Sequence, residues 1–214
     1  MTHRLVVATL NPGKLREFQD ALAGADFELV FAPDVGVTSF PPETGASYEE
    51  NALIKAGHVA AASGLPALAD DSGLEVDALG GAPGVYTARF GGPGLTDGER
   101  MAHLLRKLRN TPAEQRTAHF RTVIVLATPA GAVQAFHGET QGTILQGPRG
   151  MDGFGYDPIF FSPELGKSFA EASIAEKRRV SHRGRALAAF AAWAASDGGN
   201  EVLRDTVVRS VETD

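Results

Sequence analysis

The order of predicted elements along the chain indicates a mixed α/β fold. Two strand-then-helix units open the sequence, two long β-branched segments occupy its middle, and an alanine-rich helix returns near its end. Strands that alternate with helices favour parallel pairing, whereas consecutive strands joined by a turn favour an antiparallel hairpin. The sequence therefore predicts a mixed α/β fold.

The first unit joins an apolar strand to a helix with a polar start. Residues 5–8 read as the strand, and apolar side chains recur at helical spacing over residues 12–23. Asn11 is a preferred N-cap residue, and Pro12 suits the first helical position. Residues 27–31 are predicted to form the second strand.

A loop and a capped helix follow. Residues 33–45 are rich in proline and glycine, which predicts a loop that carries Glu43. Ser47 and Glu50 have the spacing of a capping box, so a helix is expected over residues 48–62. Such a loop can present a side chain into a cleft.

The middle of the chain contains a short apolar run and a glycine-rich loop. Residues 67–70 are predicted to form a strand that ends in an acidic turn. Six glycines within residues 80–94 indicate an ordered loop over a site. A second capping box predicts a helix over residues 96–108.

The remaining elements are a hairpin and a return helix. Residues 117–128 and 132–144 alternate and are rich in β-branched side chains, which predicts an antiparallel hairpin in a second lobe. Ser173 and Glu176 are expected to start a short helical segment. Ser181 is expected to cap a longer helix through Trp193, and residues 197–200 are expected to end it.

Composition narrows the class of protein. The 214 residues include 43% hydrophobic residues and carry a formal net charge of −6, which fits a globular core and argues against duplex DNA or an anionic membrane as partner. The absence of cysteine excludes thiolate chemistry and suits the reducing cytoplasm. No signal peptide or apolar run of about 18 to 20 residues is present, so we expect a soluble cytoplasmic protein.

The first helix start has the features of an anion site. Asn11, Pro12 and Gly13 are expected to leave free backbone N–H groups at the positive helix end. Lys14 adds an ammonium group one turn inside. The segment lacks the GxxxxGK[ST] spacing of a Walker loop, so a different phosphate-binding architecture is expected.

Carboxylates occur where the predicted third strand breaks. Asp70, Asp71 and Ser72 form either an ordinary polar turn or part of a cation site, and an isolated pair of aspartates favours the turn. Magnesium takes one or two carboxylates together with substrate phosphates and water. Glu43 is the best second contributor to such a site.

Two further polar segments admit a structural and a functional interpretation. Phe154, Tyr156 and Asp157 lie among glycines, where aromatic faces either fill the core or stack on a planar base. Lys177 and residues 181–183 form either a solvated basic face or a set of donors for a carbonyl or phosphate oxygen.

Six motifs in a fixed order resemble the inosine/xanthosine triphosphate pyrophosphatase family, over about residues 4–195. These are TLNPGK at 9–14, ETG with EENA at 43–52, ADDSG at 69–73, LGGAPGVYTAR at 79–89, GFGYDP at 153–158 and SHR at 181–183. Any single motif is weak, but six in order make an accidental match implausible.

The resemblance implies a two-lobed α/β fold, with a central mixed sheet flanked by helices and a substrate cleft between lobes. It implies one catalytic domain over residues 1–200, with residues 201–214 as an extension of unknown role. It also implies a homodimer and Mg2+-dependent hydrolysis of ITP, dITP and XTP to nucleoside monophosphate and pyrophosphate. Such an enzyme cleanses the nucleotide pool before incorporation into DNA or RNA.

By the same resemblance, Asp71 is the proton acceptor and a metal ligand, Glu43 is a second metal carboxylate, and Lys14 acts in catalysis. The residues implied to bind substrate are Thr9, Leu10, Asn11, Pro12, Gly13, Lys14, Lys55, Ser72, Phe154, Gly155, Tyr156, Asp157, Lys177, His182 and Arg183. Lys55 is expected to be a second phosphate cation.

Two alternatives stay open at this point. One is a related pyrophosphatase that acts on modified pyrimidine or guanine triphosphates. The other is a nucleotide-sensing module that binds phosphates without turnover, although a sensor has less need for carboxylates near the phosphates.

Overall fold

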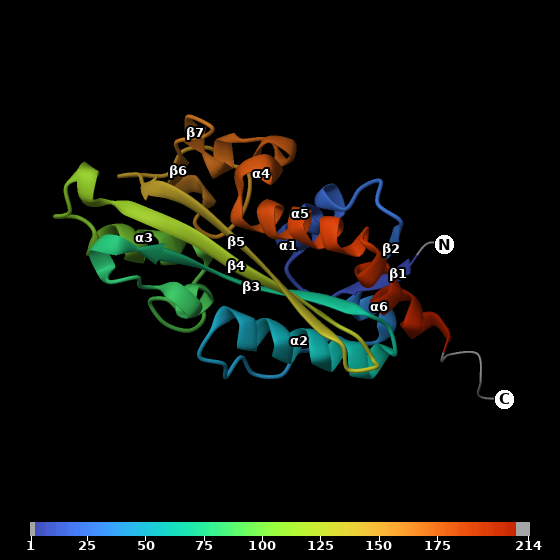
Figure 1. Cartoon of the computed structure of the whole chain (residues 1–214). Helices are drawn as coiled ribbons and strands as arrows, with labels where there is room; N and C mark the ends of the chain where they lie inside the picture. Colours follow the sequence, from blue (N-terminus) through green and yellow to red (C-terminus); the bar gives the residue numbers. More distant parts are fainter. Residues whose placement is uncertain (1–2, 209–214) are drawn as a thin grey trace. The chain divides into compact units, whose positions relative to one another are not determined.

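The computed structural model describes residues 3–208, and the strands in this part form one mixed sheet of order β2-β1-β3-β4-β5-β6-β7 (Figure 1). β1 pairs in parallel with β2 and β3, whereas β6 pairs antiparallel with β5 and β7. This confirms the predicted mixed sheet. The strands are β1 (His3–Val7), β2 (Phe27–Phe31), β3 (Ala67–Val76), β4 (Thr117–Ala127), β5 (Val133–Ile144), β6 (Phe160–Ser162) and β7 (Lys167–Ser168).

Most helices begin at the capping residue that the sequence predicts. The side chain of Asn11 accepts from two backbone N–H groups of the first turn, and Ser47 accepts from Glu50. Complete capping boxes are present at Thr96 and Ser173. The helices are α1 (Pro12–Ala21), α2 (Tyr48–Ser63), α3 (Asp97–Lys107), α4 (Ile174–Val180), α5 (His182–Ala194) and α6 (Asp197–Val208).

The chain divides into two compact units. Unit 1 extends to Asp71 and takes in Val123–His137 and the chain from Ala186 onward, whereas unit 2 contains Ser72–Thr122 and Gly138–Arg185. The β4–β5 hairpin therefore contributes to both units, and its assignment to a second lobe alone was wrong. A long hairpin can do this because its ends and its turn lie many residues apart.

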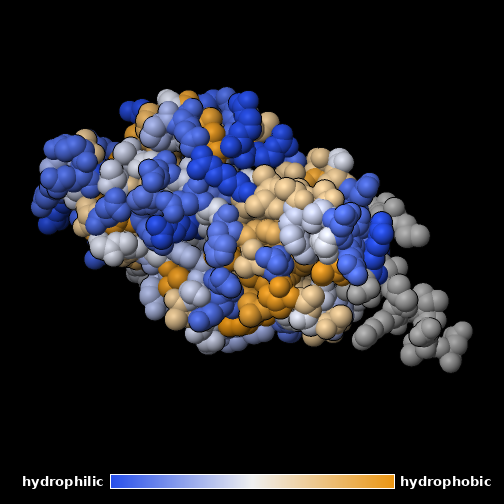
Figure 2. Space-filling model, viewed as in Figure 1, coloured by the Kyte–Doolittle hydropathy of each residue, from blue (hydrophilic) through white to orange (hydrophobic). Residues whose placement is uncertain are grey.

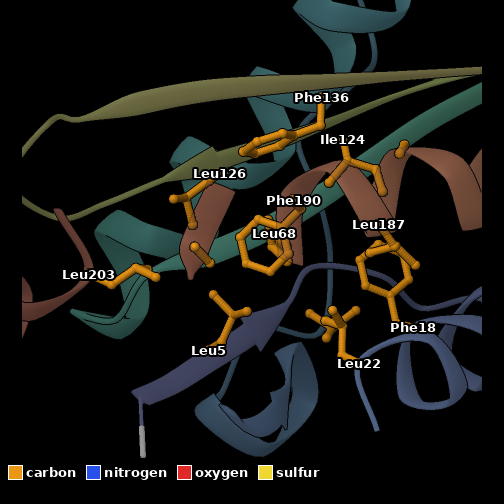
Figure 3. Packing of buried hydrophobic residues seen from close by; sticks show 13 residues of the cluster. Leu5, Phe18, Leu22, Leu68, Ile124, Leu126, Phe136, Leu187, Phe190 and Leu203 are labelled. Atoms are coloured by element: carbon orange, nitrogen blue, oxygen red, sulfur yellow. The ribbon is translucent and has the colours of Figure 1, made fainter. Parts of the chain in front are cut away.

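Unit 1 buries both faces of its strands. Leu5 and Val7 of β1 point to one face, where α1, α5 and α6 contribute Phe18, Phe190 and Leu203 (Figure 3). Val6 points to the opposite face, which packs against alanines and Val59 of α2. Consecutive side chains of a strand alternate between faces, so a strand covered on both sides reads as a continuous apolar run.

Unit 2 has its own core. Phe120, Phe160 and Phe169 form its aromatic centre, with ring centroids 4.6 to 6.0 Å apart. Arg116 is buried beside them, and its guanidinium donates to the carbonyl oxygens of three residues, among them Leu108 just after α3. Three carbonyl acceptors satisfy the donors of this buried cation.

Two predicted boundaries were wrong. β3 runs without interruption through Asp70 and Asp71, which lie within the strand and not in a turn. Residues 197–200 begin α6 and do not end α5, because Ser196 accepts from the backbone N–H of Gly199 at 3.2 Å and so caps a new helix. Leu203 of α6 lies in the unit 1 core.

The surface mixes polar and apolar areas. Apolar residues gather over α2, where the side chain of Leu53 is exposed, and a paler patch covers the alanines of α5 (Figure 2). Among the described residues, none of the helices combines the length and the apolarity that crossing a membrane requires.

Candidate functional site

Two aspartates in the middle of β3 organise the charged residues of unit 1. Asp70 and Asp71 are buried, with 2% and 7% of their surface exposed, and as consecutive strand residues they point to opposite faces. Lys14 of α1 lies 2.9 Å from Asp70, and Lys55 of α2 lies 3.3 Å from Asp71. One lysine thus reaches each aspartate from the helix on its own side of the strand.

These lysines explain why β3 continues where a turn was predicted. Two adjacent aspartates in sequence signal a turn because an unpaired carboxylate needs water. In the fold, each carboxylate meets an ammonium group from a helix that is distant in sequence. Tertiary ion pairs replace the solvation that a turn provides, so the strand persists.

The start of α1, where phosphate was predicted to bind, does not have the free backbone N–H groups that we expected. The Oδ1 atom of Asn11 accepts from the backbone N–H groups of Gly13 at 2.8 Å and Lys14 at 3.2 Å. The backbone N–H of Asn11 donates to the Thr9 hydroxyl at 3.1 Å. These N–H groups are therefore engaged and not free. The attraction for an anion rests on the positive helix end and on the ammonium of Lys14.

A carboxylate from the preceding loop joins the cluster at Lys55. The ammonium of Lys55 lies 2.7 Å from Oε1 of Glu43 and 3.3 Å from Oδ1 of Asp71, so it bridges the two. The predicted metal carboxylates therefore share one lysine. We call Lys14, Glu43, Lys55, Asp70 and Asp71 the charged cluster.

Asn51 is a residue of this region to which the sequence analysis gave no role. Its side chain is fully buried in α2, and its Nδ2 donates to Oδ2 of Asp71 at 3.2 Å. Its Oδ1 accepts from the backbone N–H of Gly45 at 2.8 Å, two residues after Glu43. One amide thus orients Asp71 and also holds the loop of Glu43. Its position four residues before Lys55, on the same helix face, was the available signal.

The charges of the cluster shift the pKa values of its members. Burial raises the pKa of Asp71, and the charge of Glu43 raises it further, against the lowering effects of Lys55, Lys14 and the Asn51 hydrogen bond. Burial lowers the pKa of Lys55, but the charges of Asp71, Asp70 and Glu43 outweigh it, so the pKa lies above its ordinary value. Three carboxylates thus face two ammonium groups.

The donor set of the cluster fits a hard divalent cation. Asp71 and Glu43 offer carboxylate oxygens on either side of a single ammonium group, and the cluster has more carboxylates than lysines. Mg2+ prefers oxygen ligands and takes few of them from protein. Among the described residues, no group of three or more histidine and acidic side chains is arranged to hold a metal ion. The carboxylates of Asp71 and Glu43 are therefore the ligands that we assign to the cation.

The second group of predicted residues lies in unit 2 around the base loop, which we define as Phe154–Asp157. The carboxylate of Asp157 accepts from the backbone N–H of Phe154 at 2.9 Å and pairs with Lys177 at 2.5 Å. Lys177 and Asp157 are both buried. A buried ion pair with a backbone hydrogen bond therefore fixes the two ends of the loop.

The two aromatic residues of the base loop have different surroundings. Tyr156 is buried in the unit 2 core, and its hydroxyl donates to the carbonyl oxygen of Thr87 at 3.2 Å. Burial raises its pKa. Phe154 is partly exposed, and its ring centroid lies 5.0 Å from Nζ of Lys177 and 5.7 Å from the guanidinium carbon of Arg183. Of the two rings, Phe154 is the one placed to meet a ligand.

The basic residues of this region are buried and do not form a solvated face. His182 and Arg183 at the start of α5 expose 3% and 2% of their surface. Arg183 donates to the hydroxyl of Ser72 at 2.9 Å, and that hydroxyl lies 2.8 Å from the hydroxyl of Thr122. The ring of His182 stacks on Phe120 with centroids 4.8 Å apart.

The contact between α4 and α5 depends on a glycine. A Cβ atom on Gly184 would collide with the backbone carbonyl of Arg178 in α4. This close approach sets the spacing of Lys177 in α4 from the basic residues at the start of α5. The predicted site residues thus fall into two groups, and Asp71 and Ser72, one from each unit, are consecutive in β3.

These residues define an α/β protein with lysine-paired carboxylates around one strand and a loop of aromatic and basic residues. The chain belongs to the Ham1 family, whose sequence pattern it matches over residues 5–193. This confirms the resemblance that the motifs predicted.

Individual relatives agree with this assignment. The chain is 54% identical over 187 residues to a dITP/XTP pyrophosphatase of Thermus thermophilus. These aligned residues cover 87% of this chain and 89% of the relative. It is 53% identical over 189 residues to a dITP/XTP pyrophosphatase of Deinococcus deserti, covering 88% of each.

Solved structures show the same fold. A HAM1 protein from Coxiella burnetii is 41% identical with a TM-score of 0.80, over 89% of this chain and 97% of that one. A nucleoside-triphosphatase (dITP/XTP pyrophosphatase) from Mycobacterium abscessus is 45% identical with a TM-score of 0.69, over 87% and 98%. The predicted α/β fold class is confirmed.

Proposed function

We propose that this protein hydrolyses dITP, ITP and XTP to the nucleoside monophosphate and pyrophosphate, and so removes these nucleotides before polymerases use them. The observation that carries the proposal is the buried Lys55, shared by Glu43 and Asp71 beside the Lys14–Asp70 pair. Relatives above 50% identity that carry the name dITP/XTP pyrophosphatase support it.

In the proposed reaction, water attacks the α-phosphorus, and the bond from that phosphorus to the oxygen bridging to the β-phosphorus breaks. Asp71 accepts the proton of the water, and pyrophosphate leaves. Lys14 and Lys55 offset the negative charge that grows on the departing group. Mg2+, held by Asp71 and Glu43, supplies Lewis-acid polarisation of the phosphate oxygens when bound.

Asn51 and Asp70 support this chemistry without acting in it. Asn51 donates to Oδ2 of Asp71 while Lys55 lies at Oδ1, so the carboxylate is held at both oxygens. Asp70 holds the ammonium of Lys14 in place before the phosphates arrive. A preformed arrangement of charges avoids reorganisation during the reaction.

Choice of the base is assigned to unit 2. Phe154 offers a ring face for stacking, and Lys177, His182 and Arg183 supply donors for the 6-oxo oxygen. Adenine presents an amino group at that position, and a buried donor facing another donor can give roughly 10⁴-fold rejection. The burial of Lys177 and Arg183 strengthens this discrimination, because water cannot replace the lost hydrogen bonds.

We also propose that the protein acts in the cytoplasm as a homodimer. The absence of cysteine supports a reducing compartment. Light scattering during size-exclusion chromatography tests the dimer, and a monomeric mass at micromolar concentration contradicts it.

A substrate panel with product identification tests the proposed function. ITP, dITP, XTP, GTP, dUTP and methylated pyrimidine triphosphates are compared with and without Mg2+. Monophosphate and pyrophosphate from dITP and XTP support the proposal. Preference for GTP or a pyrimidine triphosphate favours the related pyrophosphatase, and binding of dITP without turnover favours the sensing module.

A further inference from the structure

A carboxylate that has no part in the proposed reaction holds the base loop at its centre. Oδ2 of Asp97, the first residue of α3, accepts a hydrogen bond from the backbone N–H of Gly155 at 2.8 Å. The two residues are 58 positions apart in the sequence. The contact therefore ties the loop to a helix that supplies none of the predicted site residues.

Gly155 is the residue of the loop that needs such an external contact. Its φ of 59° lies in the left-handed region that favours glycine, and it has no side chain by which a neighbour could fix it. The residues on either side are anchored differently. Asp157 binds the backbone N–H of Phe154, and the hydroxyl of Tyr156 binds the carbonyl of Thr87.

The start of α3 gives Asp97 a defined position. Thr96 and Glu99 form a complete capping box, which fixes the first turn of the helix. Arg100 in the same turn donates to the carbonyl oxygens of Leu95 and Ala88, so the preceding loop is held as well. A carboxylate on this turn is a rigid acceptor for Gly155.

The exposure of Asp97 separates a positioning role from a packing role. Its side chain is 58% exposed, and its carboxylate lies 3.9 Å from the guanidinium of Arg100. Replacing Asp97 therefore removes little buried surface. What it removes is the hydrogen bond that sets the backbone of Gly155, directly after Phe154.

We propose that Asp97 is a positioning residue for base recognition, which fixes Gly155 and thereby the direction in which Phe154 faces the purine. The inference rests on the proposed function, because it takes the base loop to be the base-binding element. It concerns the base and not the phosphates, since the contacts of Asp97 lie in unit 2 and the charged cluster lies in unit 1.

The test compares three variants of the full chain with dITP as substrate. Asp97→Ala is expected to raise KM about three- to tenfold with kcat within about twofold of wild type, because a hydrogen bond to a charged acceptor is lost. Asp97→Asn retains an acceptor oxygen and is expected to stay within about twofold in KM. Glu114→Ala is the matched control, since it removes an exposed carboxylate of unit 2 that does not contact Gly155, and it is expected to leave KM unchanged.

Inhibition by inorganic tripolyphosphate separates base binding from phosphate binding. This inhibitor has no base, so its inhibition constant is expected to be the same for wild type and Asp97→Ala. The proposal is overturned if Asp97→Ala leaves KM unchanged, if the constant rises in parallel with KM, if Asp97→Asn is as impaired as Asp97→Ala, or if Glu114→Ala raises KM equally.

Failure of the proposed function is visible separately. If wild-type protein does not hydrolyse dITP, that proposal fails whatever the variants do. Equilibrium binding of dIMP to the same variants then tests Asp97 by itself. Weaker binding by Asp97→Ala alone supports the positioning role, and equal binding by wild type and Asp97→Ala refutes it.

Discussion

The charged cluster of unit 1 and the base loop of unit 2 both contain buried lysine–aspartate pairs, yet they are held by different kinds of contact. In the cluster, the side chains of Lys14 and Lys55 contact acidic side chains, and these contacts join α1, α2, the loop of Glu43 and β3. In the base loop, carboxylates bind backbone N–H groups, as Asp157 does for Phe154 and Asp97 for Gly155.

This difference suits the two tasks that we propose. Side-chain ion pairs hold the charged groups in place before phosphates and a cation arrive. Backbone contacts fix the course of the chain, and with it the shape that a rigid planar base must match. In the proposed function, the chemistry thus depends on preformed ion pairs between side chains and the recognition on a fixed backbone, and the following experiments test that division.

The largest effect is expected for Asp71→Asn. Loss of the proton acceptor should reduce kcat for dITP by about 10³-fold or more. Burial raises the pKa of Asp71, which means that burial disfavours its charged form. The fold should therefore persist, because the neutral amide of asparagine has the same shape and carries no charge. Steady-state kinetics and thermal unfolding measure both, with the exposed Glu49→Gln on α2 as control. Turnover near that of wild type would remove Asp71 from the central role.

A large effect on stability is expected for Lys177→Met in unit 2. Asp157 would remain buried without its ammonium partner, which lowers the free energy of unfolding by about 3 kcal/mol. Urea denaturation measures the change. The control is Lys167→Met, whose partly exposed pair with Glu176 is expected to contribute less than about 1 kcal/mol. Equal losses for the two variants would contradict the importance of the buried pair.

A smaller effect on catalysis is expected for Lys14→Gln. The amide retains a donor for Asp70 but no charge for the leaving pyrophosphate, so kcat/KM for dITP should fall by about 10- to 100-fold. Tm should change little in comparison. Arg16→Gln, an exposed position on the same helix, serves as control. An unchanged kcat/KM for Lys14→Gln would argue against a phosphate contact by Lys14.

The smallest effect concerns the acid stability of α4. Glu176 of α4 accepts hydrogen bonds from Lys167 and Ser173, and these lower its pKa to about 2, below the ordinary value of 4.5. The ionised form is therefore the stabilising one, and its contribution is complete above about pH 4.5 and is lost as the pH falls toward 2. The Tm difference between wild type and Glu176→Gln should shrink over that interval. A difference that stays constant with pH would contradict the assignment.

Local signals predicted much of the fold. The caps at Asn11, Ser47, Thr96 and Ser173 act on the next three or four residues, so the sequence alone locates the starts of α1 to α4. The same locality explains the error at β3. A turn was predicted at Asp70 and Asp71, because the lysines that neutralise them lie far away in sequence.

The predicted site residues show the same limit. Motif order indicated the residues of the charged cluster and the base loop, but it gave no sign of which partner each side chain would find. Asn51 was missed although it lies four residues before Lys55 on the same helix face. Asp97 was missed because its partner is the backbone N–H of Gly155, which carries no sequence signature. Burial of Arg183 was likewise unpredictable, since it depends on how α5 meets its neighbours.

Gly184 of α5 lies so close to the backbone carbonyl of Arg178 that a side chain does not fit there. A single added methyl group there must push α4 and α5 apart, and with them Lys177 and Arg183. If Lys177 and Arg183 recognise the base as proposed, substitution of a residue without any functional group is expected to disturb base recognition as a substitution of Lys177 or Arg183 does.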